Sequence, residues 1–240
     1  MEILAIIPAR GGSKKIPQKN IMDFYGEPLI KWSIEAAMAS NKITRIITST
    51  DNHEIAEIAK NLGSEVPFIR PEQYAQDDTV DYPVYKHALD YLEHNENYIP
   101  ELIVQLRPTT PVRPKDLIDS GIDLINGNSN ADSLRCVTIP FQTPYKMWSI
   151  TGDGYLSPLF DSGIREQYNH PRQLLPPAYW QVGSLDIIRR DTIINKNSMT
   201  GDNIIPLIIN NKYAVDIDDE LSFDFAISVV KKYGMFPDDI

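Results

Sequence analysis

The chain has 240 residues, of which 42% are hydrophobic and 23% are charged, and its formal net charge is −10. These proportions exclude a disordered or fibrous protein, the acidic balance argues against a nucleic acid or an acidic membrane as partner, and no apolar run approaches the about 18 residues of a membrane span. A single cysteine, Cys136, excludes an internal disulfide, and because residues 1–4 do not resemble a secretion signal we expect a cytoplasmic protein.

In the first half of the chain, short β-branched runs alternate with segments of helical periodicity. The alternation is typical of βαβ units, so we predict an α/β protein whose mostly parallel sheet is covered by helices on both faces. Asp51 or Asn52 can cap the second helix, and Gly63 ends it. The expected strands cover residues 3–7, 45–49, 65–68 and 102–106, and the expected helices cover 29–39, 53–62, 81–92 and 114–125.

The second half contains a proline-rich segment, residues 140–178, that has little helical periodicity. Within it, residues 146–159 can form a hairpin that turns at 152–154 and packs against another subunit; the alternative is an irregular loop folded back on its own domain. We treat the whole chain, residues 1–240, as a single domain into which this segment is inserted. Further strands are expected at 134–139, 179–188 and 204–209, and a closing helix is expected at 220–232.

A basic, glycine-containing loop at residues 8–20 directly follows the first strand. Two adjacent glycines, Gly11 and Gly12, allow backbone N–H groups to approach an anion, and four cations, among them Arg10 and Lys19, can bind phosphate oxygens. The spacing matches neither a Walker loop nor a dinucleotide fingerprint. Because ligands of α/β proteins bind at the carboxyl ends of strands, the loop is a candidate polyphosphate site; the alternative is a mobile cationic surface loop.

Two carboxylates, Asp216 and Asp218, precede the closing helix in an extended stretch. Side chains two residues apart face the same side of such a stretch, so both can converge on one Mg²⁺ ion, whose coordination substrate phosphates and water would complete. The alternative is that Asp218 or Asp219 only caps the following helix.

Cations and hydroxyls follow other predicted strands. Arg70 could read the edge of a base, and Arg107 with Thr109 closes the strand at 102–106, although a solvated arginine and a simple proline-bounded turn are the alternatives. Lys146 and Arg172 bring positive charge into the proline-rich segment, where an anionic co-substrate could be bound.

The ordered set of these motifs resembles the acylneuraminate cytidylyltransferases, which make CMP-sialic acid and related compounds. The resemblance rests on residues 8–14 with 19–20, on 49–51, 70–71, 108–111 and 171–173, and on 215–218, and it covers nearly the whole chain. It implies a Rossmann-like nucleotidyltransferase fold, a homodimer held by the inserted segment, and Mg²⁺-dependent transfer of CMP from CTP to a nine-carbon 2-keto sugar acid, with release of pyrophosphate.

The resemblance also implies roles for individual residues. Arg10, Lys19, Asp216 and Asp218 would form the catalytic group, and the two aspartates would bind the metal. The sugar acid would be bound by Arg107, Lys146, Arg172 and Gln181, with Arg172 able to reach the site of a partner subunit. CTP would be bound by Ala9, Arg10, Gly11, Gly12, Ser13, Lys14, Lys19, Asn20, Arg70, Asp78 and Thr109.

Two departures from the family pattern fall on the sugar side. Arg107 replaces the usual glutamine before Pro-Thr, and Gln181-Val182-Gly183 stands where the relatives carry Asn-Gly. The identity of the sugar acid therefore stays open, and legionaminic-type acids are among the candidates. Three rival functions remain: transfer of a nucleotide to a sugar 1-phosphate or with another base, a D-x-D glycosyltransferase, and a silent binding homologue.

Overall fold

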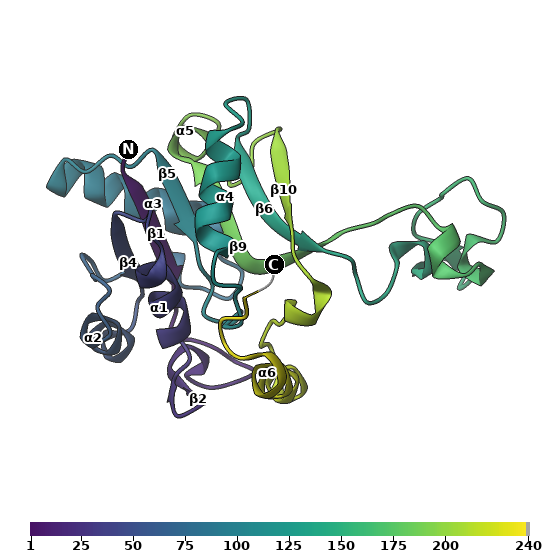
Figure 1. Cartoon of the computed structure of the whole chain (residues 1–240), viewed down its shortest axis with the longest axis horizontal. Helices are drawn as coiled ribbons and strands as arrows, with labels where there is room; N and C mark the ends of the chain where they lie inside the picture. Colours follow the sequence, from purple (N-terminus) through teal and green to yellow (C-terminus); the bar gives the residue numbers. More distant parts are fainter. Residues whose placement is uncertain (239–240) are drawn as a thin grey trace.

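The computed structural model describes residues 1–238 and contains a six-stranded sheet in the order β10-β6-β9-β5-β1-β4 (Figure 1). β1 runs parallel to β4 and β5, and β10 runs parallel to β6, whereas β9 is antiparallel to both of its neighbours. The prediction of a mostly parallel sheet is confirmed. The strands are β1 (Ile3–Pro8), β4 (Arg45–Ser49), β5 (Leu102–Gln105), β6 (Ser133–Thr138), β9 (Trp180–Arg189) and β10 (Ile204–Ile208).

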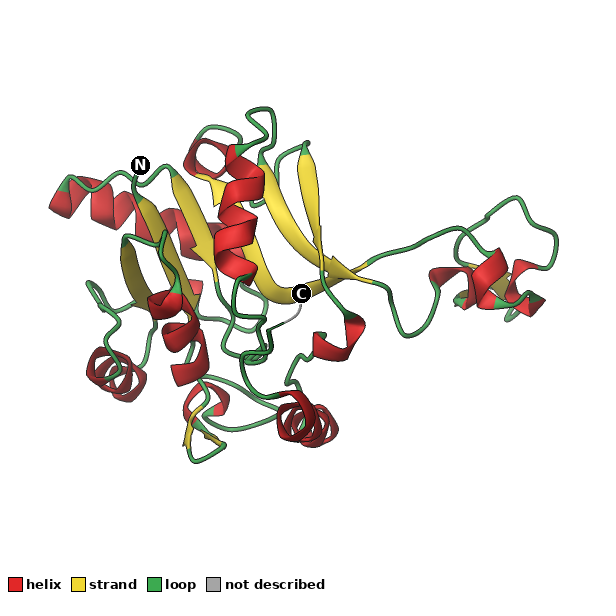
Figure 2. Ribbon diagram, in the orientation of Figure 1, coloured by secondary structure: helices red, strands yellow, loops and turns green. Residues whose placement is uncertain are grey.

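Helices cover both faces of this sheet, as the alternating pattern predicts (Figure 2). In β1 the side chains of Ile3, Ala5 and Ile7 enter a core with α1, α2, α4 and α6, while Leu4 and Ile6 enter a second core with α3 and α5. A strand buried on both faces is apolar at every position, which is why β1 shows no alternation. The helices are α1 (Lys31–Ala39), α2 (His53–Asn61), α3 (Asp81–Glu96), α4 (Leu117–Asn126), α5 (Arg190–Ile194) and α6 (Glu220–Tyr233).

Within residues 1–238, no helix has the length and apolar character that crossing a membrane requires. Several short strands and turns connect the larger elements. The short strands are β2 (Asp23–Phe24), β3 (Glu27–Pro28), β7 (Trp148–Ile150) and β8 (Leu156–Pro158). The 3-10 turns are η1 (Lys19–Ile21), η2 (Glu72–Tyr74), η3 (Pro144–Lys146), η4 (Gln167–Asn169), η5 (Arg172–Leu174) and η6 (Asn211–Tyr213).

The structure corrects some element boundaries. The strand expected at 65–68 is wrong: only isolated bridges form, at Glu65 and Ile69, because Pro67 between them has no N–H to donate to a ladder. The helix expected from 114 begins at Leu117, and the one expected from 29 begins at Lys31. The prediction that Asn52 caps α2 is confirmed, since its side chain accepts hydrogen bonds from two backbone N–H groups of the first turn.

The proline-rich segment forms an arm that projects from the body of the molecule (Figures 1 and 2). β7 and β8 pair antiparallel around a turn in which Gly154 has a φ of +87°, so the predicted hairpin is confirmed. Large apolar side chains of the arm are exposed, among them Ile150, Tyr155 and Leu156. Whether another subunit covers them stays a prediction.

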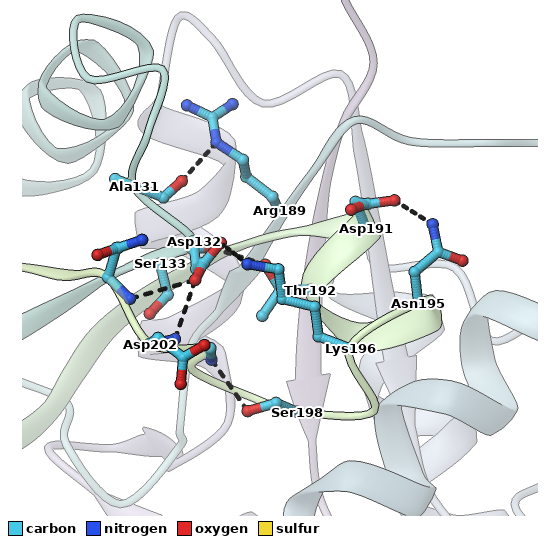
Figure 3. A network of polar contacts seen from close by, with 12 residues as sticks. Ala131, Asp132, Ser133, Arg189, Asp191, Thr192, Asn195, Lys196, Ser198 and Asp202 are labelled. Atoms are coloured by element: carbon cyan, nitrogen blue, oxygen red, sulfur yellow. Dashed lines mark hydrogen bonds and ion pairs between the residues drawn. The ribbon is translucent and has the colours of Figure 1, made fainter.

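A buried carboxylate, Asp132, fastens the loop between α5 and β10 to the start of β6 (Figure 3). It accepts hydrogen bonds from Lys196 Nζ at 2.6 Å and from the backbone N–H groups of Asp202 at 2.9 Å and Asn203 at 3.1 Å. Gly201 lies so close that a Cβ there would be 2.4 Å from Asp132 Oδ2. The Lys196 hydrogen bond and the two backbone donors lower the pKa of Asp132 to about 2.

Replacing Asp132 by Asn is expected to lower Tm by several degrees at pH 7, because the loop loses its ion pair with Lys196. The pKa of this carboxyl is lower in the folded chain than in the unfolded chain. Its stabilisation is therefore complete above about pH 4 and is lost as the pH falls toward 2. Denaturant unfolding across this range should show the difference between D132N and the parent shrinking to nothing. The matched control, D224N on the exposed face of α6, should differ little at any pH; an equal effect there would contradict the prediction.

Candidate active site

A cleft of about 700 Å³ lies at the carboxyl ends of β1 and β5, beside the start of β9. Such a position is where parallel sheets bind ligands. The predicted site residues that line it are Arg10, Ser13, Lys19, Asn20, Arg70, Arg107, Thr109, Gln181, Asp216 and Asp218. Segments as far apart in the sequence as Arg10 and Asp218 therefore meet in one cleft.

The glycine loop is held in shape by hydrogen bonds of its own. The Gly11 N–H donates to Asp51 Oδ1 at 2.9 Å, and Asn20 Nδ2 donates to the Arg10 carbonyl at 2.9 Å. A Cβ at position 11 would lie 2.8 Å from the side chain of Asn52, whereas nothing lies within 4 Å of one at Gly12. Gly11 is thus required by packing against the cap of α2, and the open backbone is at Gly12. Ala9, also predicted to contact the nucleotide, is fully buried behind the loop.

Two cations of the loop share one counterion that the sequence does not reveal. Arg10 lies 3.0 Å from Asp77 Oδ1 and also donates to the Gln76 carbonyl at 2.7 Å, and Lys14 forms an ion pair with the other oxygen of Asp77. The hydrogen bond from Lys14 does most to lower the pKa of Asp77, and the charge of Arg10 lowers it further. Asp77 and its neighbour Thr79 line the cleft, whereas the predicted Asp78 does not.

The two predicted metal ligands face the cleft from the segment before α6. Ile217 between them is buried, and its N–H donates to the Thr109 carbonyl at 2.8 Å, which aims the flanking carboxylates outward. The capping role belongs to Asp219, which forms a capping box with Ser222. This division leaves Asp216 and Asp218 available to a ligand.

Lys19 connects the loop to this acidic segment. Its Nζ donates to the Ile217 carbonyl at 2.8 Å and to Asp218 Oδ1 at 3.0 Å. The walls of the cleft limit solvation of Asp216 and raise its pKa; a hydrogen bond from Thr109 opposes this, and the charge of Asp218 adds to it. A cation beside Asp216 would relieve the cost of holding its charge.

The acidic pair fits a metal that arrives with its substrate. Within residues 1–238, no three His, Cys, Asp or Glu side chains converge in a way that could hold a metal ion. Two carboxylates are nevertheless the protein ligands that Mg²⁺ commonly takes when water and substrate phosphates supply the rest. Asp216 and Asp218 therefore suit Mg²⁺ bound together with a polyphosphate.

Arg70 is only 5% exposed, and its main contacts are structural. It donates to the Ser49 carbonyl at the end of β4 and, at 3.3 Å, to the Tyr74 carbonyl, while its Nε has no partner among the described residues. Burial lowers the pKa of its guanidinium. Arg70 ties β4 to η2 and still reaches the wall of the cleft, so its contact with a base stays a prediction.

Arg107 is held in the cleft by Asp81, the first residue of α3. Burial by itself lowers the pKa of the guanidinium, but the charge of Asp81 and the hydrogen bond to it outweigh burial, and the pKa is raised. Gly183 packs against this arginine, since a Cβ there would lie 3.0 Å from Arg107 Cδ. A glycine at this point of β9 therefore accompanies the arginine that departs from the family pattern.

Two predicted sugar-acid contacts lie outside the cleft of their own chain. Lys146 is in η3 of the arm. Arg172 donates to the carbonyls of Pro140 and Phe141 and lines a separate hollow of about 320 Å³ at the base of the arm. Neither residue meets Asp216 within one copy of the chain.

Sequence reasoning missed half of the lining of the cleft. Asp81 stands at the start of a predicted helix, a position that marks a helix terminus but not a contact with Arg107, and nothing around Asp77 marks it. The lining residues to which no role was assigned are Pro8, Tyr74, Gln76, Asp77, Thr79, Asp81, Val84, Pro108, Trp180 and Gly183, although Pro8, Pro108 and Gly183 stand within motifs that the sequence analysis singled out.

Comparison with known proteins gives consistent results. Residues 4–147 match the family model described as cytidylyltransferase. The chain is 28% identical over 226 residues to a pseudaminic acid cytidylyltransferase of Campylobacter jejuni, covering 94% of this chain and 95% of the relative. It is 30% identical over 222 residues to a CMP-N,N'-diacetyllegionaminic acid synthase of Legionella pneumophila, covering 91% of each.

Among solved structures, a CMP:2-keto-3-deoxy-manno-octonic acid synthetase complexed with CTP has a similar fold. Its TM-score is 0.69 at 14% identity, with 97% of this chain and 99% of the other covered. The likeness shows that this chain shares the fold of that protein.

Proposed function

The chain belongs to the cytidylyltransferase family, and from this premise we propose that it transfers CMP from CTP to an acidic 2-keto sugar of the nonulosonic type, with release of pyrophosphate. The observation that carries the proposal is the meeting of Arg10 and Lys19 with Asp216 and Asp218 in one cleft. Cations for a triphosphate and carboxylates for its metal are the two halves of a nucleotidyl-transfer site.

Different residues of the cleft bind the two substrates. Arg10 and Lys19 bind the triphosphate and stabilise the charge that collects on the departing pyrophosphate. Arg107 and Gln181, which also line the cleft, bind the sugar acid, whose C2 hydroxyl attacks the α-phosphorus. The new P–O bond forms as the bond to the β-phosphate breaks, and the hydroxyl proton passes to solvent. Mg²⁺ held by Asp216 and Asp218 would neutralise phosphate charge when bound.

We extend the proposal to a homodimer that works in the cytoplasm. The arm exposes apolar side chains, and neither Lys146 nor Arg172 on it lines the cleft of its own chain. An arm that packs on a partner subunit would bury these apolar side chains. It would also bring Lys146 and Arg172 toward the cleft of the partner. Light scattering coupled to size exclusion should give twice the chain mass of 27.2 kDa; a monomer that turns over normally would contradict this part.

The substrate proposal is tested by a panel. The protein is incubated with CTP, UTP, GTP or ATP and with pseudaminic, legionaminic or N-acetylneuraminic acid, 2-keto-3-deoxy-manno-octonic acid, or sugar 1-phosphates, and pyrophosphate release is measured. We expect turnover with CTP and a 2-keto sugar acid, with the CMP-sugar detected by mass spectrometry. Turnover only with a sugar 1-phosphate, or only with another nucleotide, would contradict the proposal.

A further inference from the structure

A row of polar side chains crosses the middle of the sheet beneath the sugar side of the cleft. Asp186 of β9 stands opposite Gln105 of β5 and opposite Arg135 of β6. Side chains at opposed positions lie on one face of a sheet, so these three form a line. Asp186 is only 3% exposed, and the charge of a carboxylate so placed needs a partner.

Arg135 is the partner that geometry offers. Its Nε lies 3.8 Å from Asp186 Oδ1, and neither atom has a hydrogen bond in the described residues. The separation is too long for a direct hydrogen bond but is that of an ion pair. Burial raises the pKa of Asp186 to about 6, although the charges of Arg135 and Arg107 oppose the rise, so the carboxylate is largely charged above pH 7.

The other end of the arginine reaches the cleft. Arg135 Nη1 donates to Oε1 of Gln181, which lines the cleft. An irregularity in the pairing of β6 with β9 makes this possible: Arg135 pairs with Asp186 and Val137 pairs with Gln181, so residues 182–185 of β9 stand opposite a single residue of β6. The carbonyl of Gly183 in this stretch accepts from Thr110 Oγ1 at 2.9 Å, which fixes its shape.

The chemistry of arginine then determines how the glutamine amide is turned. A guanidinium has only N–H donors, so the amide can present only its oxygen to Arg135. The amide nitrogen of Gln181, which has no protein partner in the described residues, is left to donate into the cleft. A freely rotating glutamine amide could offer a ligand either its oxygen or its nitrogen. Held by Arg135, the amide of Gln181 can offer only its nitrogen.

We propose that Arg135, anchored by Asp186, is a positioning residue that fixes Gln181 as a hydrogen-bond donor to an acceptor oxygen of the sugar acid. This inference rests on the proposed function and adds to it which group donates the hydrogen bond: the protein donates and the sugar acid accepts. The oxygen that fits is a carboxylate oxygen or an acyl carbonyl oxygen of the sugar, because neither requires an acceptor from the protein. A ligand hydroxyl that must donate would find no acceptor at Gln181.

The test measures KM for the sugar acid, kcat, and the Kd of CTP separately. Gln181→Glu keeps an acceptor for Arg135 but loses the donor, so KM for the sugar acid should rise about tenfold or more while the Kd of CTP stays within about twofold. Gln181→Leu should raise KM less than Gln181→Glu, since it adds no negative charge. Arg135→Met should raise KM about three- to tenfold by freeing the amide to rotate, and Arg135→Lys should recover most of that loss.

A double substitution separates positioning from a general structural effect. In the Gln181→Leu background, Arg135→Met should change KM no further, because no amide remains to be oriented. The matched control is Arg190→Met, which breaks the ion pair with Glu93 away from the cleft and should leave KM as it is in the parent. An equal effect of Arg135→Met in both backgrounds, or a parallel change in the Kd of CTP, would overturn the inference.

Failure of the proposed function would look different. In that case the parent protein itself would release no pyrophosphate with any 2-keto sugar acid. If the parent is active and Gln181→Glu leaves KM for the sugar acid unchanged, the function stands and the role given to Gln181 and Arg135 is wrong.

Discussion

Replacing Asp216 or Asp218 by Asn is expected to lower kcat/KM for pyrophosphate release by about a thousandfold or more, because each change removes a charged oxygen ligand from the proposed metal site. The fold should not suffer, since both side chains point into the cleft and the segment is held through Ile217 and Thr109. The raised pKa of Asp216 means that keeping its carboxylate charged costs folding free energy when no cation is bound. The free energy of unfolding of D216N should therefore equal or exceed that of the parent.

The same segment supplies the control. Asp219→Asn keeps a good capping residue for α6 and removes a charge one position away, so its turnover should stay within about twofold of the parent. The turnover of each variant is measured as initial rates at saturating CTP over a series of Mg²⁺ concentrations. Circular dichroism checks that each variant is folded. If D216N and D218N turn over as fast as D219N does, the two aspartates have no role in metal binding.

Replacing Lys19 by Met is expected to reduce kcat/KM for CTP by about 10² to 10³, the usual cost of removing a preorganised group that stabilises developing charge. Lys19 contacts the acidic segment in the absence of substrate, through the Ile217 carbonyl and Asp218. It is therefore already in place when the triphosphate arrives, and no side-chain ordering remains to oppose binding.

Lys15 in the same loop provides a matched comparison, because it is exposed and does not line the cleft. Steady-state kinetics with CTP as the varied substrate should show K15M close to the parent. A similar loss in K15M and K19M would mean that the loop acts through its total charge, and the specific role of Lys19 would be abandoned.

The sheet was largely predictable because buried parallel strands leave a strong mark on composition. The apolar runs that become β1 and β5 could be placed to within a residue or two, as could the amphipathic helix α2. The direction of β9 could not be predicted, since a reversed strand in the middle of a sheet is as apolar as its neighbours. The five-residue α5 was missed because it is too short to show a period.

The site was predictable where spacing along the chain sets which way side chains point. Asp216 and Asp218 face one side because the stretch that contains them is extended. The glycine loop lies near them because the loop and this stretch are both at the carboxyl edge of the sheet. The counterions were not predictable: Asp77 and Asp81 owe their roles to contacts across 67 and 26 residues of chain, with Arg10 and Arg107 respectively. Pairing at that distance leaves no local pattern.

Asp77 already forms ion pairs with Arg10 and Lys14, so binding of a triphosphate to these cations, as proposed, would be an exchange of one anion for another. A triphosphate that takes these cations releases a carboxylate that already neutralised part of their charge, so fewer salt ions leave the loop than its cation count suggests. Affinity for the nucleotide should accordingly fall less steeply with ionic strength than for an unpaired cluster. Other polyanions must likewise displace Asp77 before they can bind Arg10 and Lys14, so we expect this loop to bind them weakly.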